Sequence, residues 1–159
     1  YFPLGGMGIS ERIANVLDTA EQTWMHAFTY SGHPVGCAVA LRTLDIIQQE
    51  DFPAQAAEKG AYFLSRLKAA LESHPHVGEV RGKGLMCGIE FVKDKATKAE
   101  SPPAEQIGHK VHLAAQRRGL FSRLRGDVFC LAPPIITPTK LLDRIVEILA
   151  ESVGEVLGS

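Results

Sequence analysis

The sequence predicts an α/β protein, with an α+β unit in its C-terminal part where helices cover a small sheet. Downstream of residue 53, apolar residues recur every three or four positions in three segments, which is the spacing of a buried helix face. Two pairs of short apolar runs flank glycine-containing turns, a pattern typical of β-hairpins. The resulting order is α, β, β, α, β, β, α, which favours a sheet with helices on one face.

Upstream of this unit the pattern is less regular. We expect a short buried strand and a glycine-rich turn over residues 1–8, a helix over 11–17, a loop over 18–27 and a longer helix from Ser31 to Gln49. Polar residues and Pro53 interrupt the helical pattern at residues 49–53. The predicted domains are therefore residues 1–50 and residues 51–159.

Each helix of the second domain has its own boundary signal. His74-Pro75 ends the first helix, because proline cannot continue it, and Gly119 ends the second as a C′ residue. Thr137-Pro138 precedes the third helix. We expect strands at residues 77–81, 85–92, 120–123 and 128–131, a polar loop at 93–103 and the second helix at 104–118. The third helix has its apolar stripe at Leu142, Ile145, Leu149, Val153 and Val156.

The charge balance argues against an electrostatic partner. The formal net charge is -1, from 17 basic and 18 acidic residues, so the chain lacks the basic excess that attracts nucleic acid or a membrane surface. No apolar run approaches the length of a membrane span. We therefore expect no nucleic-acid partner and no membrane partner.

The cysteines and histidines point to neither a disulfide nor a metal site. The three cysteines are Cys37, Cys87 and Cys130, each in an apolar context and without a Cys-x-x-Cys pair. They are predicted to be buried thiols in a reducing compartment, so we expect a cytoplasmic location. His109 and His112 are three residues apart on a predicted helix, but no third ligand accompanies them.

The segment Phe28–Pro34 is the clearest candidate for a binding site. Ser31 suits the N-cap position of the following helix, and Pro34 suits its first turn, where the missing N–H has no cost. A helix N-terminus carries unsatisfied N–H groups and a partial positive charge, so it can bind phosphate, and Thr29 adds a hydroxyl donor. From the residues alone, two interpretations stay open: an anion site, or a capped helix without a ligand.

Four segments, in order, resemble the class III (fold type I) pyridoxal-phosphate-dependent aminotransferases, in particular the omega-transaminase branch. They are YFPLGG at Tyr1–Gly6, FTYSGHPV at Phe28–Val35, VRGKGLM at Val80–Met86 and LAPPIIT at Leu131–Thr137. The resemblance implies the fold of the PLP-dependent transferases. It identifies residues 1–50 as a remnant of the large PLP-binding domain and residues 51–159 as the C-terminal small domain.

The resemblance also assigns site residues. Phe28 and Thr29 match the positions that bind the phosphate of pyridoxal 5′-phosphate, and in this family they reach the active site of the neighbouring subunit, which implies a homodimer with active sites at the interface. Arg123 matches the mobile arginine that binds the substrate carboxylate, for which a bidentate guanidinium is suited. Arg125 is an alternative ligand, and pairing of Arg123 with Asp127 or solvent exposure of Arg123 are further alternatives.

The resemblance places the Schiff-base lysine upstream of Tyr1, so we expect no catalytic residue in this chain and no activity of the chain alone. The implied reaction moves an amino group from an amine or amino acid to a keto acid such as pyruvate. A decarboxylase or aminomutase on the same fold is one alternative, because a fold does not separate these reactions. A truncated, non-catalytic binding or interaction module is the other. The amino donor and the choice between dimer and tetramer are not indicated.

Overall fold

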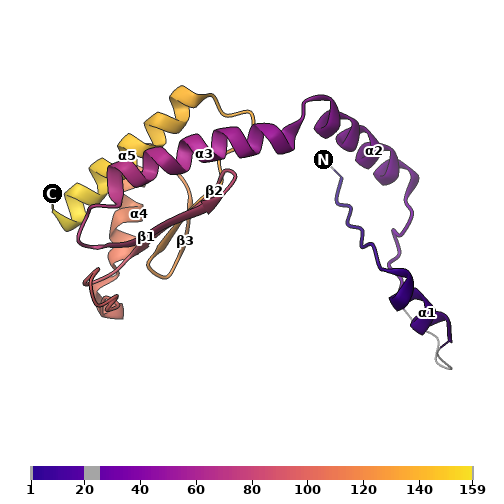
Figure 1. Ribbon diagram of the computed structural model, residues 1–159, viewed down its shortest axis with the longest axis horizontal. Helices are drawn as coiled ribbons and strands as arrows, with labels where there is room; N and C mark the ends of the chain where they lie inside the picture. Colours follow the sequence, from indigo (N-terminus) through magenta and orange to yellow (C-terminus); the bar gives the residue numbers. More distant parts are fainter. Residues whose placement is uncertain (1, 20–25, 159) are drawn as a thin grey trace. The chain divides into compact units, whose positions relative to one another are not determined.

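A computed structural model describes residues 2–19 and 26–158 of the chain (Figure 1). Its backbone divides into two compact units, Tyr1–Asp51 and Phe52–Ser159. Most of the loop predicted at residues 18–27 lies outside the described residues. Within the described part of the chain, no helix is long and apolar enough to cross a membrane.

The first unit contains two helices, α1 (Glu11–Thr19) and α2 (Pro34–Gln49). Residues 2–8 have no regular secondary structure and are mostly exposed, so the prediction of a buried strand there is wrong. A strand requires a neighbouring strand for its backbone hydrogen bonds, and the described part of this unit offers none. The ring of Phe2 instead lies over α2 at Gly36, where an added Cβ would be 2.7 Å from the ring carbon Cε1.

The second unit follows the predicted element order. It consists of α3 (Phe52–Leu71), β1 (Val77–Lys83), β2 (Met86–Phe91), the 3-10 turn η1 (Pro103–Glu105), α4 (Ile107–Arg117), β3 (Arg123–Arg125), β4 (Val128–Leu131) and α5 (Thr139–Leu157). The third strand begins later than predicted. Gly119 adopts φ 89° and Leu120 turns into the core with 9% of its surface exposed, so the chain becomes extended only at Arg123.

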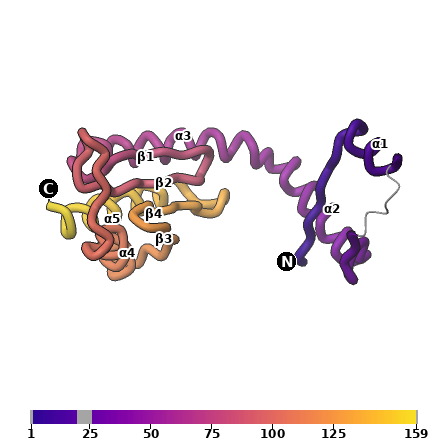
Figure 2. Tube along the Cα trace, turned by 90° about the horizontal axis from the view of Figure 1, so that it is seen from below, coloured from indigo at the N-terminus to yellow at the C-terminus, as the bar shows by residue number. Residues whose placement is uncertain are grey.

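The strands form one antiparallel sheet in the order β1-β2-β4-β3, which Figure 2 shows side by side. One row of cross-strand neighbours, Val80, Ile89, Phe129 and Leu124, belongs to the core together with apolar residues of α3, α4 and α5. The helices therefore cover one face of the sheet, as predicted, and α3 and α5 run beside each other over it (Figure 1). The opposite face is open.

A close backbone approach joins α3 to the turn between β1 and β2. A Cβ added at Gly60 in α3 would lie 2.5 Å from Cα of Gly84, nearer than side-chain carbons approach backbone atoms. Gly84 itself adopts φ 55°, which glycine reaches without steric cost. The neighbouring Lys59 donates its Nζ to the Ile135 carbonyl at 2.6 Å. Two adjacent residues of α3 thus hold two connecting segments at one end of the sheet.

We predict that Gly60→Ala lowers the free energy of unfolding by about 1–3 kcal/mol, because the new methyl group meets rigid backbone. The matched control is Gly154→Ala, an identical change inside α5 where no atom lies within 4 Å of the added Cβ. That variant should gain roughly 0.5–1 kcal/mol from better helix propensity. Urea denaturation followed by circular dichroism measures both, and equal shifts for the two variants would contradict the packing argument.

Candidate functional site

The turn before α2 is built from two successive backbone hydrogen bonds. The Ser31 N–H donates to the Phe28 carbonyl at 3.0 Å, and the His33 N–H donates to the Tyr30 carbonyl at 3.2 Å. The side chain of Ser31 adds a second hydrogen bond across the first turn, since its Oγ accepts from the Phe28 N–H at 3.2 Å. The predicted N-cap is therefore wrong: the Ser31 hydroxyl serves the turn, and His33 caps α2 by accepting from the Gly36 N–H at Nδ1, 3.4 Å away.

Aromatic contacts hold His33 in this position. Its ring stacks on Phe2 with centroids 5.1 Å apart and lies 6.0 Å from the ring of Tyr30. His33 thus serves as a hydrogen-bonding residue at the start of α2. The structure also brings together two segments that lie apart in the sequence, since Phe2 belongs to the N-terminal segment and His33 to the turn.

Thr29 leaves hydrogen-bond donors available in this turn. Neither its backbone N–H nor its hydroxyl has a partner within the described residues, and the residue is exposed. The N–H of Phe28, by contrast, is already donated to Ser31. Thr29 lies ahead of a helix N-terminus, where unsatisfied N–H groups carry a partial positive charge. Free donors and positive potential together fit a small anion such as a phosphate group.

The open face of the sheet carries the second candidate, Arg123. One row of cross-strand neighbours on this face is Arg81, Gly88, Cys130 and Arg123, and the next is Glu79, Glu90, Val128 and Arg125. Arg81 forms ion pairs with Glu79 at 2.7 Å and with Glu90, on the neighbouring strand, at 3.3 Å. The hydrogen bond that Arg81 donates to the Glu79 carboxylate is the main reason that the pKa of Arg81 lies above its usual range.

Arg123 does not pair with Asp127. The Asp127 Oδ1 instead accepts the backbone N–H of Gly108 at 2.8 Å, at the start of α4. A carboxylate at this position satisfies one of the unpaired N–H groups of the helix N-terminus and interacts favourably with its dipole. Within the described residues, Arg123 and Arg125 have no ion-pair partner, and both are exposed. Sequence alone could not exclude this pairing, because Gly108 is distant from Asp127 along the chain.

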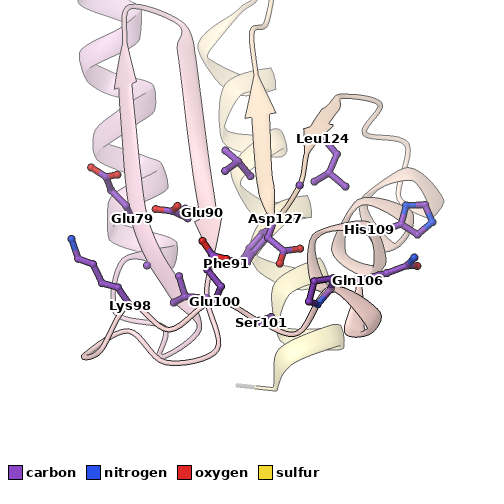
Figure 3. A pocket seen from close by; sticks show the side chains of 15 residues that line it. Glu79, Glu90, Phe91, Lys98, Glu100, Ser101, Gln106, His109, Leu124 and Asp127 are labelled. Carbon is purple, nitrogen blue, oxygen red and sulfur yellow. The ribbon is translucent and has the colours of Figure 1, made fainter.

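A pocket of about 870 Å³ lies beside the sheet, next to Glu79, Glu90 and Val128, and the sequence analysis did not predict it (Figure 3). Glu79 and Glu90 line one side, and Gln106 and His109 line the other (Figure 3). Its wall also contains Asp127, whose Oδ1 accepts the backbone N–H of Gly108. Carboxylates dominate the lining, so this pocket is poorly suited to phosphate or carboxylate ligands. In the described part of the chain, no group of His, Cys, Asp or Glu could hold a metal ion.

The two candidates share one property, an exposed polar group that could contact a small anion. Within residues 2–19 and 26–158, Thr29 has hydrogen-bond donors without a partner ahead of α2, and Arg123 has a guanidinium without an ion pair on the sheet face opposite the helices. The first suits a phosphate, and the second suits a carboxylate, which a planar guanidinium binds through two hydrogen bonds.

Comparison with known proteins identifies the family. The model of the family "Aminotransferase class-III" matches residues 2–153. An (S)-enantioselective omega-transaminase from Thermomicrobium roseum is 47% identical, with a TM-score of 0.84 over 94% of this chain and 33% of that one. An amine transaminase from an uncultivated Pseudomonas species, solved with PLP bound, is 36% identical, with a TM-score of 0.83 over 92% of this chain and 34% of that one. The chain belongs to the class III aminotransferases, which are PLP-dependent enzymes.

Curated relatives agree with this assignment. An uncharacterised aminotransferase of Sinorhizobium fredii is 42% identical over 99% of this chain and 35% of its own length. A diaminobutyrate--2-oxoglutarate transaminase of Halomonas elongata is 38% identical over 98% of this chain and 34% of its own length. The chain thus spans about one third of the curated relatives that it matches, and the predicted fold class is confirmed by the solved neighbours.

The cysteines differ in exposure more than predicted. Cys87 is buried with 6% of its surface exposed, Cys130 is half-buried on the open face, and Cys37 in α2 is exposed, so the prediction of a buried thiol is wrong for Cys37. The apolar neighbours of Cys37 in the sequence lie on a helix that buries only Gly36 within its own unit. Burial raises the pKa of the Cys87 thiol from 9.0 to about 11.

We predict that iodoacetamide at pH 8 alkylates Cys37 rapidly in the 159-residue chain and leaves Cys87 unmodified. The thiolate is the reactive form, and a pKa of about 11 leaves little of it at this pH, in addition to the steric protection of the core. Mass spectrometry of peptides after timed labelling measures both rates. Labelling in urea is the control, since unfolding should make the two cysteines react alike; equal rates in the folded chain would refute the assigned burial.

Proposed function

We propose that this chain forms the C-terminal part of an aminotransferase subunit that moves an amino group from an amine or amino acid to a keto acid such as pyruvate. The observation that supports this proposal most strongly is the turn at residues 28–33, where Thr29 has hydrogen-bond donors without a partner in the described residues, ahead of α2. The match to the class III family over residues 2–153 agrees with it. The complete enzyme would be about three times as long, because its relatives are matched over 34% and 35% of their length.

The residues of the turn fit the phosphate group of pyridoxal 5′-phosphate. Thr29 would hold it through its N–H and its hydroxyl, while Phe28, whose N–H is donated to Ser31, would position the turn. When bound, this cofactor supplies an electron sink for reactions at the amino-bearing carbon. The work of Thr29 in the proposed enzyme is to fix the position of the cofactor, and the cap formed by His33 keeps the helix start rigid around it.

Arg123 would bind the carboxylate of the amino or keto acid. Its guanidinium is exposed, unpaired within the described residues and placed on a short strand, so it is available for a bidentate contact. Exposed apolar side chains occupy the same end of the sheet: Met86 in the adjoining hairpin is 72% exposed, and Phe121, two residues before Arg123, is 78% exposed. An arginine beside apolar side chains suits a substrate that has a carboxylate and an apolar part.

The proposed enzyme is a homodimer with active sites at the subunit interface, in the cytoplasm. Support for an interface comes from the first unit, whose apolar side chains are largely exposed: Met7 is 76%, Phe28 is 71%, Tyr30 is 73% and Leu41 is 65% exposed. An exposed apolar surface of this kind marks an interaction site, because leaving it in water is unfavourable. The exposed cysteine Cys37 is compatible with a reducing compartment.

We predict that Thr29→Val weakens cofactor binding by roughly 10-fold or more in the complete enzyme, since a hydrogen bond to a charged phosphate is lost. Absorbance titration with pyridoxal 5′-phosphate gives the dissociation constant. The matched control is Thr43→Val, the same change within α2, where the hydroxyl donates only to the Val39 carbonyl at 2.8 Å. If both variants bind the cofactor as the unchanged enzyme does, the proposed phosphate site is wrong.

We predict that Arg123→Gln raises KM for pyruvate by roughly 10- to 100-fold with little change in cofactor affinity, because it removes charge-assisted hydrogen bonds to the carboxylate. Arg144→Gln is the control, since Arg144 lies on α5 and pairs with Glu147 at 3.0 Å, away from the open sheet face. Steady-state kinetics and the absorbance titration separate the two effects. An unchanged KM in the Arg123 variant would remove the carboxylate role.

A further inference from the structure

The pocket beside the sheet carries an excess of negative charge. Its lining contains four carboxylates and one lysine, which are Glu79, Glu90, Glu100, Asp127 and Lys98. Two further cations lie near it without lining it: Arg81, which pairs with two of the glutamates, and Arg125, which shares their cross-strand row. Even when both arginines are counted with the lysine, four carboxylates stand against three cations, so the pocket favours a positively charged ligand.

The carboxylates of the lining keep hydrogen-bond acceptor positions for such a ligand. Asp127 accepts the backbone N–H of Gly108 at 2.8 Å through Oδ1, and Glu90 accepts from Arg81 at 3.3 Å through Oε2. A carboxylate offers about four acceptor positions over its two oxygens, so each of these groups can accept further hydrogen bonds. Glu100 is exposed and has no ion pair within residues 2–19 and 26–158.

A buried hydroxyl in the same lining lacks a hydrogen-bond partner. Ser101 is only 8% exposed, and its hydroxyl makes no hydrogen bond within the described residues. Among the side-chain polar atoms of this part of the chain, only Nδ1 of His112 is both unpartnered and completely enclosed by protein. The Ser101 hydroxyl therefore keeps access to the pocket that it lines, and Figure 3 shows it between the sides formed by Glu90 and Gln106. A ligand in the pocket would supply the missing hydrogen bond, whose absence is unfavourable at a buried site.

We propose that this pocket is a binding site for a small aliphatic amine in its ammonium form. An ammonium group has three donors and no acceptor, which matches carboxylates together with a hydroxyl oxygen. Aliphatic amines stay protonated at neutral pH, because their pKa is about 10. The volume of about 870 Å³ lies within the range of roughly 300–1,000 Å³ that small-molecule sites occupy.

The lining also selects among cations and amines. No group of His, Cys, Asp or Glu within residues 2–19 and 26–158 could hold a metal ion, which favours an organic cation over a metal. Phe91, Leu124 and Val128 in the lining provide apolar contact for a carbon chain. An amino acid is disfavoured, since its own carboxylate would meet the carboxylates of the pocket. This inference goes beyond the proposed function and uses neither Thr29 nor Arg123.

The test measures binding of butylamine to the complete enzyme by ligand-observed NMR titration. The enzyme is loaded with pyridoxamine 5′-phosphate, which has no aldehyde with which the amine can react. Glu100→Gln and Asp127→Asn should each raise the dissociation constant by roughly 10-fold, the effect of losing a charge-assisted contact, and Ser101→Ala by about 2- to 10-fold. Asp127→Asn keeps an oxygen that can accept the N–H of Gly108, so the fold should be retained.

Two controls isolate the charge of the pocket. Glu147→Gln is the same change as Glu100→Gln, at a residue of α5 that pairs with Arg144 and does not line the pocket, and it should leave the dissociation constant unchanged. Butanol has the same chain without a charge, so it should bind at least 10-fold more weakly than butylamine. Melting curves by circular dichroism should be equal for Glu100→Gln and the unchanged enzyme.

Several results would overturn the inference. One is an unchanged enzyme that does not bind butylamine, and another is equal binding of butanol. If butylamine binds but Glu100→Gln and Ser101→Ala bind it as the unchanged enzyme does, the amine lies elsewhere and the pocket is not its site. An equal loss in Glu100→Gln and Glu147→Gln would indicate a general effect of charge and would also refute the site. None of these results bears on the cofactor affinity of Thr29→Val or on the KM of Arg123→Gln, so the proposed function stands or falls separately.

Discussion

The backbone contact between Gly60 of α3 and Gly84 of the β1–β2 turn is the constraint on which the second unit depends. The helix can come this close to the turn only because residue 60 carries no Cβ, and the loss of helix propensity at Gly60 is the cost of that approach. Lys59, one residue away, binds the carbonyl of Ile135, so the same turn of α3 also fixes the segment after β4. Ile135 follows β4 along the chain, and β4 pairs with β3, the strand that contains Arg123.

Periodicity made most of this unit predictable. The apolar residues on one side of α5 and the alternate residues of β2 indicate which side chains face the core. Leu142, Leu149 and Ile89 are fully buried, as these patterns predict. Glycine marked the end of α4 for a local reason, since only glycine adopts the φ of 89° found at residue 119 without strain. These features are encoded within a few residues, and a single sequence is enough to find them.

Features that depend on distant partners were not predictable in the same way. Ser31 and His33 are both competent to cap a helix, and the choice between them follows from the Phe28 N–H and from the stacking of Phe2 on His33. Likewise, the apolar sequence around Cys37 predicts burial, but within its own unit α2 has little against which to pack. The lining of the acidic pocket comes from several separate segments of the chain, so no single stretch of sequence predicts the pocket.

The same distinction explains why the sequence could name Arg123 and Arg125 but could not say what they do. In sequence, Arg81 lies two residues from Glu79 and Arg125 lies two residues from Asp127, so the two arginines have equal local prospects of an ion pair. In the fold, Arg81 keeps its acid and gains Glu90 across the hairpin, whereas Asp127 is taken by the start of α4. Asp127 is thus oriented toward a helix N-terminus, and Arg123 and Arg125 have no ion pair within the described residues. Exposed arginines tolerate the absence of an ion pair in water at small cost, and so they stay available to a ligand.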